Sequence, residues 1–328
     1  MPFITRREFF LAAISPFVAP IAAKALVFKG VDYMPISQLA RFCGMRYRTN
    51  IVGKSQSVYS KTTKLTFEVH SKCMELNGLS VWLLFPVAMQ KNMLYIAKQD
   101  YIKTIAPILY PQKNGTAGNL FHIVIDAGHG GKDNGAENRK LGIKEKAISF
   151  DIAKRLAVEL KKNGYRVTFT RSDDTFKELP DRPAYANRQR ANLFLSIHCN
   201  AASPSVSGIE TFSLTPRWAP STTSAKLTSS DKIAYAGNAN DGWNQLIAYY
   251  IQRAMRASTL AADRGVKRAR FAVLRDLKMP GALIECGFIS NTAEGKKLAT
   301  AAYRQKIATA IASAVYTYQR TLKRVKNG

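Results

Sequence analysis

From residue 121 onward, short apolar runs alternate with longer segments of helical periodicity. The largely apolar runs at 123–125, 193–197 and 282–284 are bounded by Gly or polar residues, a pattern that predicts buried parallel strands. Residues 145–162 predict an amphipathic helix, because apolar side chains recur at helical spacing, namely Ile148, Ile152, Leu156 and Leu160. This alternation predicts an α/β fold with a mostly parallel sheet flanked by helices on both faces.

The preceding segment has a different pattern. Residues 64–70 alternate as a strand would, and Asn77-Gly78 predicts a tight hairpin turn. Short stretches of helical spacing lie on either side. We therefore expect a small α+β domain over residues 26–112. A linker should follow over 113–120, where Gly and Asn occur without periodicity.

Residues 215–242 interrupt the strand and helix pattern. They are rich in Ser and Thr and show no helical period. Long insertions of this kind in compact domains are functional loops or mobile segments. Two interpretations stay open: the insertion forms one wall of a groove, or it is a surface loop without a role. We expect one α/β domain over residues 121–323 that carries this insertion loop.

The composition limits the partners. The 328 residues include 49 Lys and Arg against 22 Asp and Glu, a formal charge of +27. Such a charge attracts polyanions, which include nucleic acid, anionic lipid and acidic wall polymers. The basic residues are spread through the chain, and neither a zinc finger nor an RNP-like aromatic motif is present. We therefore expect no nucleic-acid partner.

The first 25 residues have the features of an export signal. Two arginines, Arg6 and Arg7, precede an apolar stretch at 9–22, and Ala-Lys-Ala at 23–25 fits a cleavage site. The stretch is short and contains two prolines, so we expect no membrane span in the mature protein. Thr-Arg-Arg-Glu-Phe-Phe at 5–10 resembles the twin-arginine signal. The expected location is the periplasm or cell envelope.

Polar residues follow the apolar runs at the points where chemistry is expected. His129, His198 and Glu285 each come directly after or close to such a run, and Glu145 opens the predicted helix. Because the carboxyl ends of parallel strands meet at one edge of a sheet, these side chains should lie together. Two imidazoles and one carboxylate are a usual zinc donor set, which His129, Glu145 and His198 supply. Glu285 is then a carboxylate able to move a proton.

Most of these residues also have a structural interpretation. Glu145 could be an acid that favours the first turn of its helix, and His198 could be a core histidine. Asp126 is either a partner of a metal ligand or the end of a strand. The Gly-rich turn at 128–131 could cradle phosphate, but it meets neither the G-x-G-x-x-G nor the P-loop pattern. Glu285 resists such an interpretation, because a buried acid without a partner costs free energy.

The segments around these residues resemble the zinc-dependent N-acetylmuramoyl-L-alanine amidases, with their amidase type 3 catalytic domain. The segments are 129–136, 145–146, 196–201 and 283–291. The resemblance implies that His129, Glu145 and His198 bind Zn²⁺ and that Glu285 is the catalytic acid and base. It also implies that peptidoglycan is the substrate, cut at the amide between N-acetylmuramic acid and L-alanine.

Residues 26–112 resemble the N-terminal module of copper amine oxidases, which also occurs in exported cell-wall enzymes. Whether this module binds the wall or packs against the catalytic domain stays open. Some members of the amidase family carry a helix in the place of 215–242, which blocks the site until a partner removes it. No helical pattern occurs in that place here, which argues against a blocking helix of this kind. An activating partner stays unknown.

Two further alternatives remain. The chain could be another exported zinc hydrolase that acts on a wall polymer, namely a peptidase or a deacetylase. Four cysteines occur without a CxxC spacing, which argues against a structural zinc knot. Cys199 and Cys286 each follow a candidate site residue, and they are either small buried side chains or a disulfide between neighbouring strands.

Overall fold

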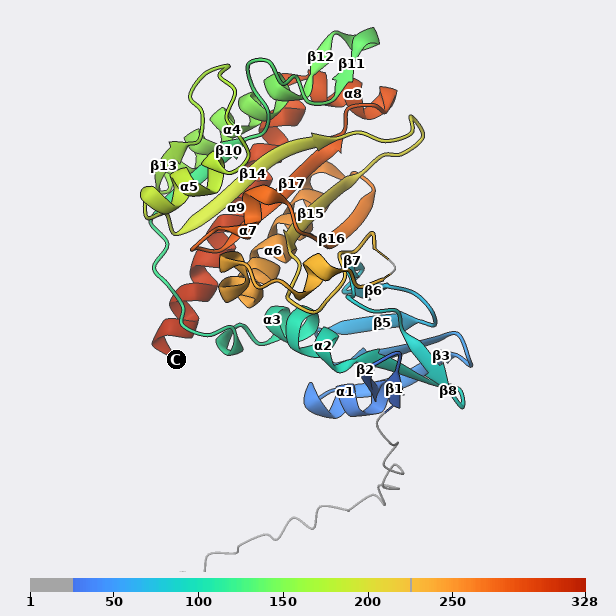
Figure 1. Cartoon of the computed structure of the whole chain (residues 1–328). Helices are drawn as coiled ribbons and strands as arrows, with labels where there is room; N and C mark the ends of the chain where they lie inside the picture. Colours follow the sequence, from blue (N-terminus) through green and yellow to red (C-terminus); the bar gives the residue numbers. More distant parts are fainter. Residues whose placement is uncertain (1–25, 225) are drawn as a thin grey trace, which may run out of the picture.

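The computed structural model describes residues 26–224 and 226–328, so the predicted export signal at 1–25 lies outside the described residues. An eleven-stranded sheet runs through the molecule in the order β13-β10-β14-β17-β15-β16-β7-β6-β5-β4-β3 (Figure 1). Within the described part of the chain, no helix is long and apolar enough to cross a lipid bilayer.

The C-terminal half of the sheet is mostly parallel. Its strands are β10 (His122–Ala127), β13 (Arg166–Phe169), β14 (Leu193–Asn200), β15 (Ile209–Leu214), β16 (Asp263–Ala269) and β17 (Gly281–Phe288). Strands β13, β10, β14 and β17 pair in parallel, whereas β15 runs antiparallel to β17 and parallel to β16. Every residue of β10 and β17 is buried, as expected for central strands covered on both faces.

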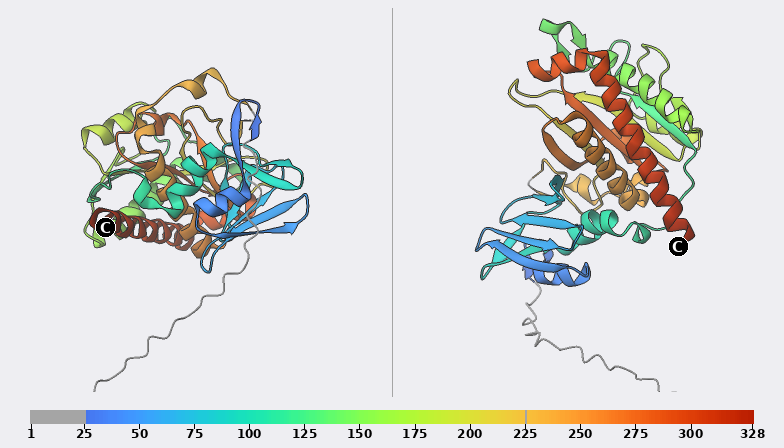
Figure 2. Two further views of the ribbon diagram at one scale, coloured as in Figure 1. Left: turned by 90° about the horizontal axis from the view of Figure 1, so that it is seen from below. Right: turned by 180° about the vertical axis from the view of Figure 1, so that it is seen from behind.

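Helices flank both faces of this half, which confirms the predicted fold class. One face carries α4 (Glu145–Lys162), α6 (Asp241–Thr259) and α9 (Ala301–Asn327). Seen from behind, α9 crosses the sheet beside the other two (Figure 2). The other face carries α5 (Asp181–Arg188) and α7 (Ala272–Arg275), and α8 (Thr292–Ala299) precedes α9. The apolar ridge predicted for α4 is buried. A hairpin before α4 consists of β11 (Glu137–Asn138), η3 (Arg139–Leu141) and β12 (Ile143–Lys144).

The N-terminal part completes the sheet with antiparallel strands. They are β3 (Arg46–Ile51), β4 (Ser55–Tyr59), β5 (Lys64–Glu68), β6 (Cys73–Leu76) and β7 (Leu79–Trp82). Asn77 and Gly78 have φ angles of 52° and 77°, which suit the tight turn predicted there. Strand β7 also pairs with β16 in parallel, at Val81 and Val266. One sheet therefore spans both parts of the chain.

A smaller sheet and several short helices pack beside these strands. The smaller sheet has the order β1-β2-β9-β8 and consists of β1 (Leu26–Phe28), β2 (Val31–Pro35), β8 (Ala88–Gln90) and β9 (Met93–Ala97). The helices are α1 (Ile36–Phe42), α2 (Lys98–Asp100), the π-helical η1 (Tyr101–Ile105), α3 (Ala106–Leu109) and the 3₁₀-helix η2 (Pro111–Lys113). The chain leaves this part through residues 114–121 and enters β10.

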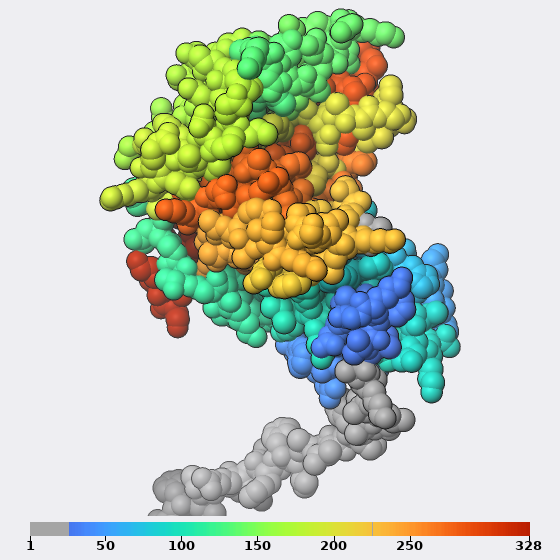
Figure 3. All heavy atoms as spheres, in the orientation of Figure 1, coloured from blue at the N-terminus to red at the C-terminus, as the bar shows by residue number. Residues whose placement is uncertain are grey.

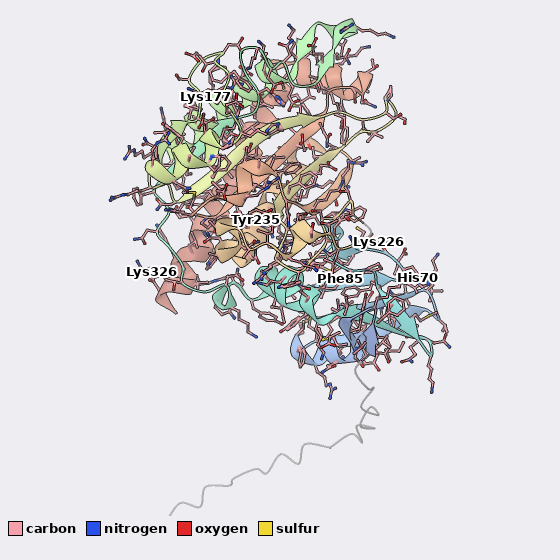
Figure 4. The ribbon with its side chains drawn as sticks, in the orientation of Figure 1. His70, Phe85, Lys177, Lys226, Tyr235 and Lys326 are labelled. Carbon is pink, nitrogen blue, oxygen red and sulfur yellow. The ribbon has the colours of Figure 1, made fainter. Side chains whose placement is uncertain are left out.

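The insertion at 215–242 lies between the two parts, where it forms the yellow to golden band of Figure 3. Its described residues form two 3₁₀-helices, η4 (Ser229–Lys232) and η5 (Ala236–Asn240). Lys72 Nζ donates to three backbone carbonyls of this segment at 3.2–3.4 Å, and Ala219 is buried in one apolar cluster with Phe85. Figure 4 labels Phe85 and Lys226 on the two sides of this junction. The insertion is therefore docked on the N-terminal part.

Candidate metal centre

The sheet brings the predicted residues together at one edge. His198 on β14 is paired with Glu285 on β17, and His129 lies two residues beyond the end of β10, which neighbours β14. Glu145 begins α4 and is buried. Its Oε1 atom lies 3.0 Å from His129 Nε2 and 2.9 Å from His198 Nδ1. The three potential ligand atoms lie within 4.8 Å of one another, as a shared cation requires.

Glycine permits this close approach. A Cβ atom on Gly128 would lie 2.3 Å from His198 Cε1, and one on Gly135 would lie 2.6 Å from Glu145 Oε2. His129 itself has a φ angle of 61°. This left-handed conformation is uncommon for a residue with a side chain and is found at functional sites, where the surrounding structure holds it. The turn is thus shaped to aim the His129 ring at Glu145.

Further hydrogen bonds fix the orientation of the donors. Asp133 Oδ2 lies 2.7 Å from His129 Nδ1, and the backbone N–H groups of Ala136 and Cys199 donate to the two oxygens of Glu145 at 2.9 and 3.0 Å. Burial raises the pKa of Glu145, but hydrogen bonds from His129 and His198 outweigh it and hold the pKa far below its usual range. Glu145 is therefore a carboxylate at neutral pH.

Two buried arginines hold the backbone of the His129 turn. Arg171 donates to the carbonyls of Ala127 and Gly128 at 2.9 Å, and Arg182 donates to the carbonyl of His129 at 3.0 Å. Asp126 pairs with Arg182 at 2.8 Å and makes no hydrogen bond to a candidate ligand side chain among the described residues. Asp126 thus acts on His129 through Arg182. Neither arginine was predicted, because a lone Arg in a polar segment carries no recognisable pattern.

Glu285 lines a cavity together with His129, Glu145 and His198. Its Oε2 atom is buried without a hydrogen-bond partner in the described part of the chain. Burial raises the pKa of Glu285 well above its usual range, and the nearby carboxylates Glu145 and Glu210 raise it further, whereas Lys267 lowers it. Such a carboxyl binds a proton more tightly than a solvated one and is suited to proton transfer.

The cavity has a volume of about 270 Å³ and joins the polar centre to an apolar wall. The polar lining includes His129, Glu145, His198, Asn200 and Glu285, and the apolar lining includes Leu179, Phe271, Val273 and Leu283. The insertion at 215–242 was one candidate for a wall of this groove, but none of its described residues lines the cavity. Residues 271–273, which follow β16, line it instead. Cys199 and Cys286 are buried free thiols, and no disulfide joins them.

Comparison with known proteins identifies the family of this chain. A family model described as N-acetylmuramoyl-L-alanine amidase matches residues 123–317. The amidase AmiA of Escherichia coli is 34% identical over 245 residues, which cover 68% of this chain and 84% of AmiA. The amidase LytC of Bacillus subtilis is 37% identical over 209 residues, which cover 63% of this chain but 37% of LytC.

Solved structures of amidases share the fold of the C-terminal part. The crystal structure of an N-acetylmuramoyl-L-alanine amidase from Clostridium difficile 630 has a TM-score of 0.52 and 33% identity, and the match covers 62% of this chain and 98% of that one. The catalytic domain of CwlV from Bacillus (Paenibacillus) polymyxa has a TM-score of 0.51 and 30% identity, with 62% and 99% covered. The chain therefore belongs to the family of N-acetylmuramoyl-L-alanine amidases, the enzymes that cut peptidoglycan between N-acetylmuramic acid and the L-alanine of the stem peptide.

Proposed function

We propose that this amidase is zinc-dependent and that His129, Glu145 and His198 hold the metal. The donor set supports the proposal, because two imidazoles and one carboxylate are typical of catalytic zinc sites. The Asp133 carboxylate on His129 Nδ1 is the kind of outer partner that orients a metal-binding histidine. Zinc bound in such a set supplies Lewis-acid chemistry, since it polarises a carbonyl oxygen and makes water more acidic.

We propose that Glu285 moves the protons of the reaction. Its Oε2 atom, to which no described residue donates a hydrogen bond, is available to take a proton from the attacking water. The same carboxyl then delivers a proton to the nitrogen of L-alanine as the amide bond breaks. The apolar wall around Leu283 and Phe271 limits access of bulk water to this exchange, which strengthens the electrostatic interactions inside the cavity.

One observation carries the proposal most directly: Glu285 shares a cavity with the three convergent donor atoms but lies outside their hydrogen-bonded set. The test compares wild type, Glu285→Gln and His198→Ala on purified peptidoglycan, with zinc content measured in each. We expect stem peptides with a free L-alanine amine from wild type alone. Glu285→Gln should retain zinc, and His198→Ala should lose it.

The products separate the proposal from its alternatives. Cleavage within the stem peptide would indicate a peptidase, and release of acetate would indicate a deacetylase. Full activity of Glu285→Gln, or loss of zinc from it, would contradict the role assigned to this residue. Full activity of a protein freed of all metal would contradict zinc dependence.

We also propose the organisation that the sequence predicts: an export signal at 1–25, a small module at 26–112, a linker at 113–120 and the catalytic domain at 121–323 with its insertion at 215–242. The likeness of 26–112 to the copper amine oxidase N-terminal module is part of this proposal. Export to the periplasm or cell envelope by the twin-arginine route supplies access to peptidoglycan. The formal charge of +27 would retain the enzyme on the anionic stem-peptide carboxylates.

A further inference from the structure

A buried ionic cluster lies one strand away from Glu285. On β15, Glu210 is the residue paired with Glu285 across the antiparallel ladder, so the two side chains leave the same face of the sheet. Glu210 is 3% exposed and forms ion pairs with Lys267 and Arg264 of β16. Lys267 is 7% exposed. Burying such charges costs free energy that apolar residues of similar volume would avoid.

The second oxygen of Glu210 bonds a residue that lines the cavity. Asn200 Nδ2 donates to Glu210 Oε1 at 2.7 Å, and Asn200 lines the cavity beside His198 and Glu285. The pairing of β14 with β17 has an irregular register between His198 and Asn200. Irregularities of this kind change the direction of side chains next to active sites. Glu210 thus fixes the amide group of Asn200 while its charge lies next to Glu285.

The cationic partners of Glu210 are in turn held from the N-terminal part. Trp82 Nε1 donates to the carbonyl of Arg264 at 2.9 Å, and Lys267 Nζ lies 5.5 Å from the centre of the Trp82 ring. This is within the range of a cation–π contact. The backbone N–H of Ser80 donates to Asp263 at 2.6 Å. Strand β7 therefore supports β16 at the residues that pair with Glu210.

We propose that Glu210 is a positioning residue for the hydrolysis, which fixes Asn200 and faces Glu285, and that Trp82 couples the N-terminal part to the active site by holding Lys267 and Arg264 in place. This inference rests on the proposed role of Glu285. The effect of Lys267 and Glu210 on the pKa of Glu285, in opposite directions, agrees with it.

The test uses the zinc-loaded full-length mature protein and a soluble muropeptide, with kcat, KM and urea unfolding measured for each variant. Glu210→Gln should lower kcat at least about tenfold with KM changed less than about threefold. The double variant Glu210→Gln/Lys267→Met removes both charges, so its stability should recover relative to the single variant while its kcat stays low. Lys267→Arg keeps the cation and should retain most of kcat. Trp82→Ala should lower kcat more than Trp82→Phe, which keeps an aromatic ring.

The matched control is the single variant Asp151→Asn, which leaves Arg304 without its carboxylate partner in an ion pair between α4 and α9 away from the cavity lining. It should lose stability without losing kcat. Recovery of kcat together with stability in the Glu210→Gln/Lys267→Met variant would overturn the proposal, as would an equal loss of kcat in the control. Glu285→Gln is measured alongside: if it stays active, the proposed role of Glu285 fails. If it is inactive while Glu210→Gln keeps wild-type kcat, the positioning role fails alone.

Discussion

Asp133 and Glu145 contact opposite nitrogens of the His129 ring: Asp133 Oδ2 lies 2.7 Å from Nδ1, and Glu145 Oε1 lies 3.0 Å from Nε2. Asp133 is four residues after His129 in the same turn, so the histidine and its partner come from one short segment. An acceptor on Nδ1 places the ring hydrogen there and leaves Nε2 as a free donor of electrons to a metal.

Removing this acceptor should weaken metal binding. For Asp133→Asn we expect zinc affinity to fall roughly 10–100-fold, because the His129 ring loses its orientation and part of its basicity. Competition with a chromophoric chelator measures the affinity. Glu137→Gln is the control, since Glu137 is an exposed carboxylate nearby that bonds Asn134. Equal affinity of Asp133→Asn and wild type would exclude the orienting role.

The glycine before His129 leaves no room for a methyl group. For Gly128→Ala we expect loss of bound zinc and of hydrolysis, because the added Cβ would lie 2.3 Å from His198 Cε1 and must push that ring out of place. Zinc content and peptide release are the measurements. Gly118→Ala is the matched control, because no atom lies within 4 Å of its added Cβ. A zinc-loaded, active Gly128→Ala protein would show that the ring tolerates the shift.

Asp100 in the N-terminal part should make stability depend on pH. Burial raises its pKa to about 6 against hydrogen bonds from Leu84, Phe85 and Thr104. Folded Asp100 binds a proton more tightly than the unfolded chain does. Protonated Asp100 therefore contributes fully to the free energy of unfolding when the pH is below its unfolded pKa of 3.8. This contribution is lost as the pH rises through about 6, a change of roughly 3 kcal/mol.

Urea unfolding of wild type and Asp100→Asn between pH 4 and 7 tests this. The difference in unfolding free energy, wild type minus variant, should fall as the pH rises through this window. A difference that is constant with pH would show that Asp100 has an ordinary pKa in the folded protein.

The ammonium group of Lys72 should decide how firmly the insertion is docked. For Lys72→Met we expect faster proteolytic cleavage within 215–242, because three backbone carbonyls lose their hydrogen bonds. Hydrolysis of peptidoglycan should change little, since the described residues of the insertion stay clear of the cavity. Limited proteolysis with mass spectrometry locates the cuts, and Lys226→Met, at an exposed lysine of the insertion, serves as control. Equal cleavage rates in both variants would contradict the docking role.

The sequence alone was sufficient for the elements that carry their own periodicity. The predicted helix at 145–162 has these bounds in the structure, and the runs before His198 and Glu285 are neighbouring parallel strands. Parallel strands place their carboxyl ends together, so the convergence of the donors follows from the pattern. The reversed direction of β15 could not be predicted, because the alternation of side chains is the same in both directions of a strand.

The supporting contacts were beyond prediction for a different reason. Arg182 reaches His129 from α5, and Lys267 reaches Glu210 from a neighbouring strand. Each such pair joins residues far apart in sequence through one ion pair or hydrogen bond, which leaves no periodic trace. Asp133 was not predicted either, although an acid four residues after a candidate ligand histidine is a signal that the sequence contains.

The pairing of Val81 with Val266 has a consequence for biosynthesis. Strand β7 leaves the ribosome long before β16 does, and at usual synthesis rates the gap lasts on the order of 10–40 seconds. During that interval the edge of Leu79–Trp82 exposes unpaired backbone groups and apolar side chains that are buried in the folded protein. Edges of this kind pair with other chains and start aggregation. We therefore expect the nascent chain to need rapid synthesis of β16 or a chaperone bound at β7. Substitutions that slow the pairing of β16 with β7 should lower the yield of folded protein more than its free energy of unfolding.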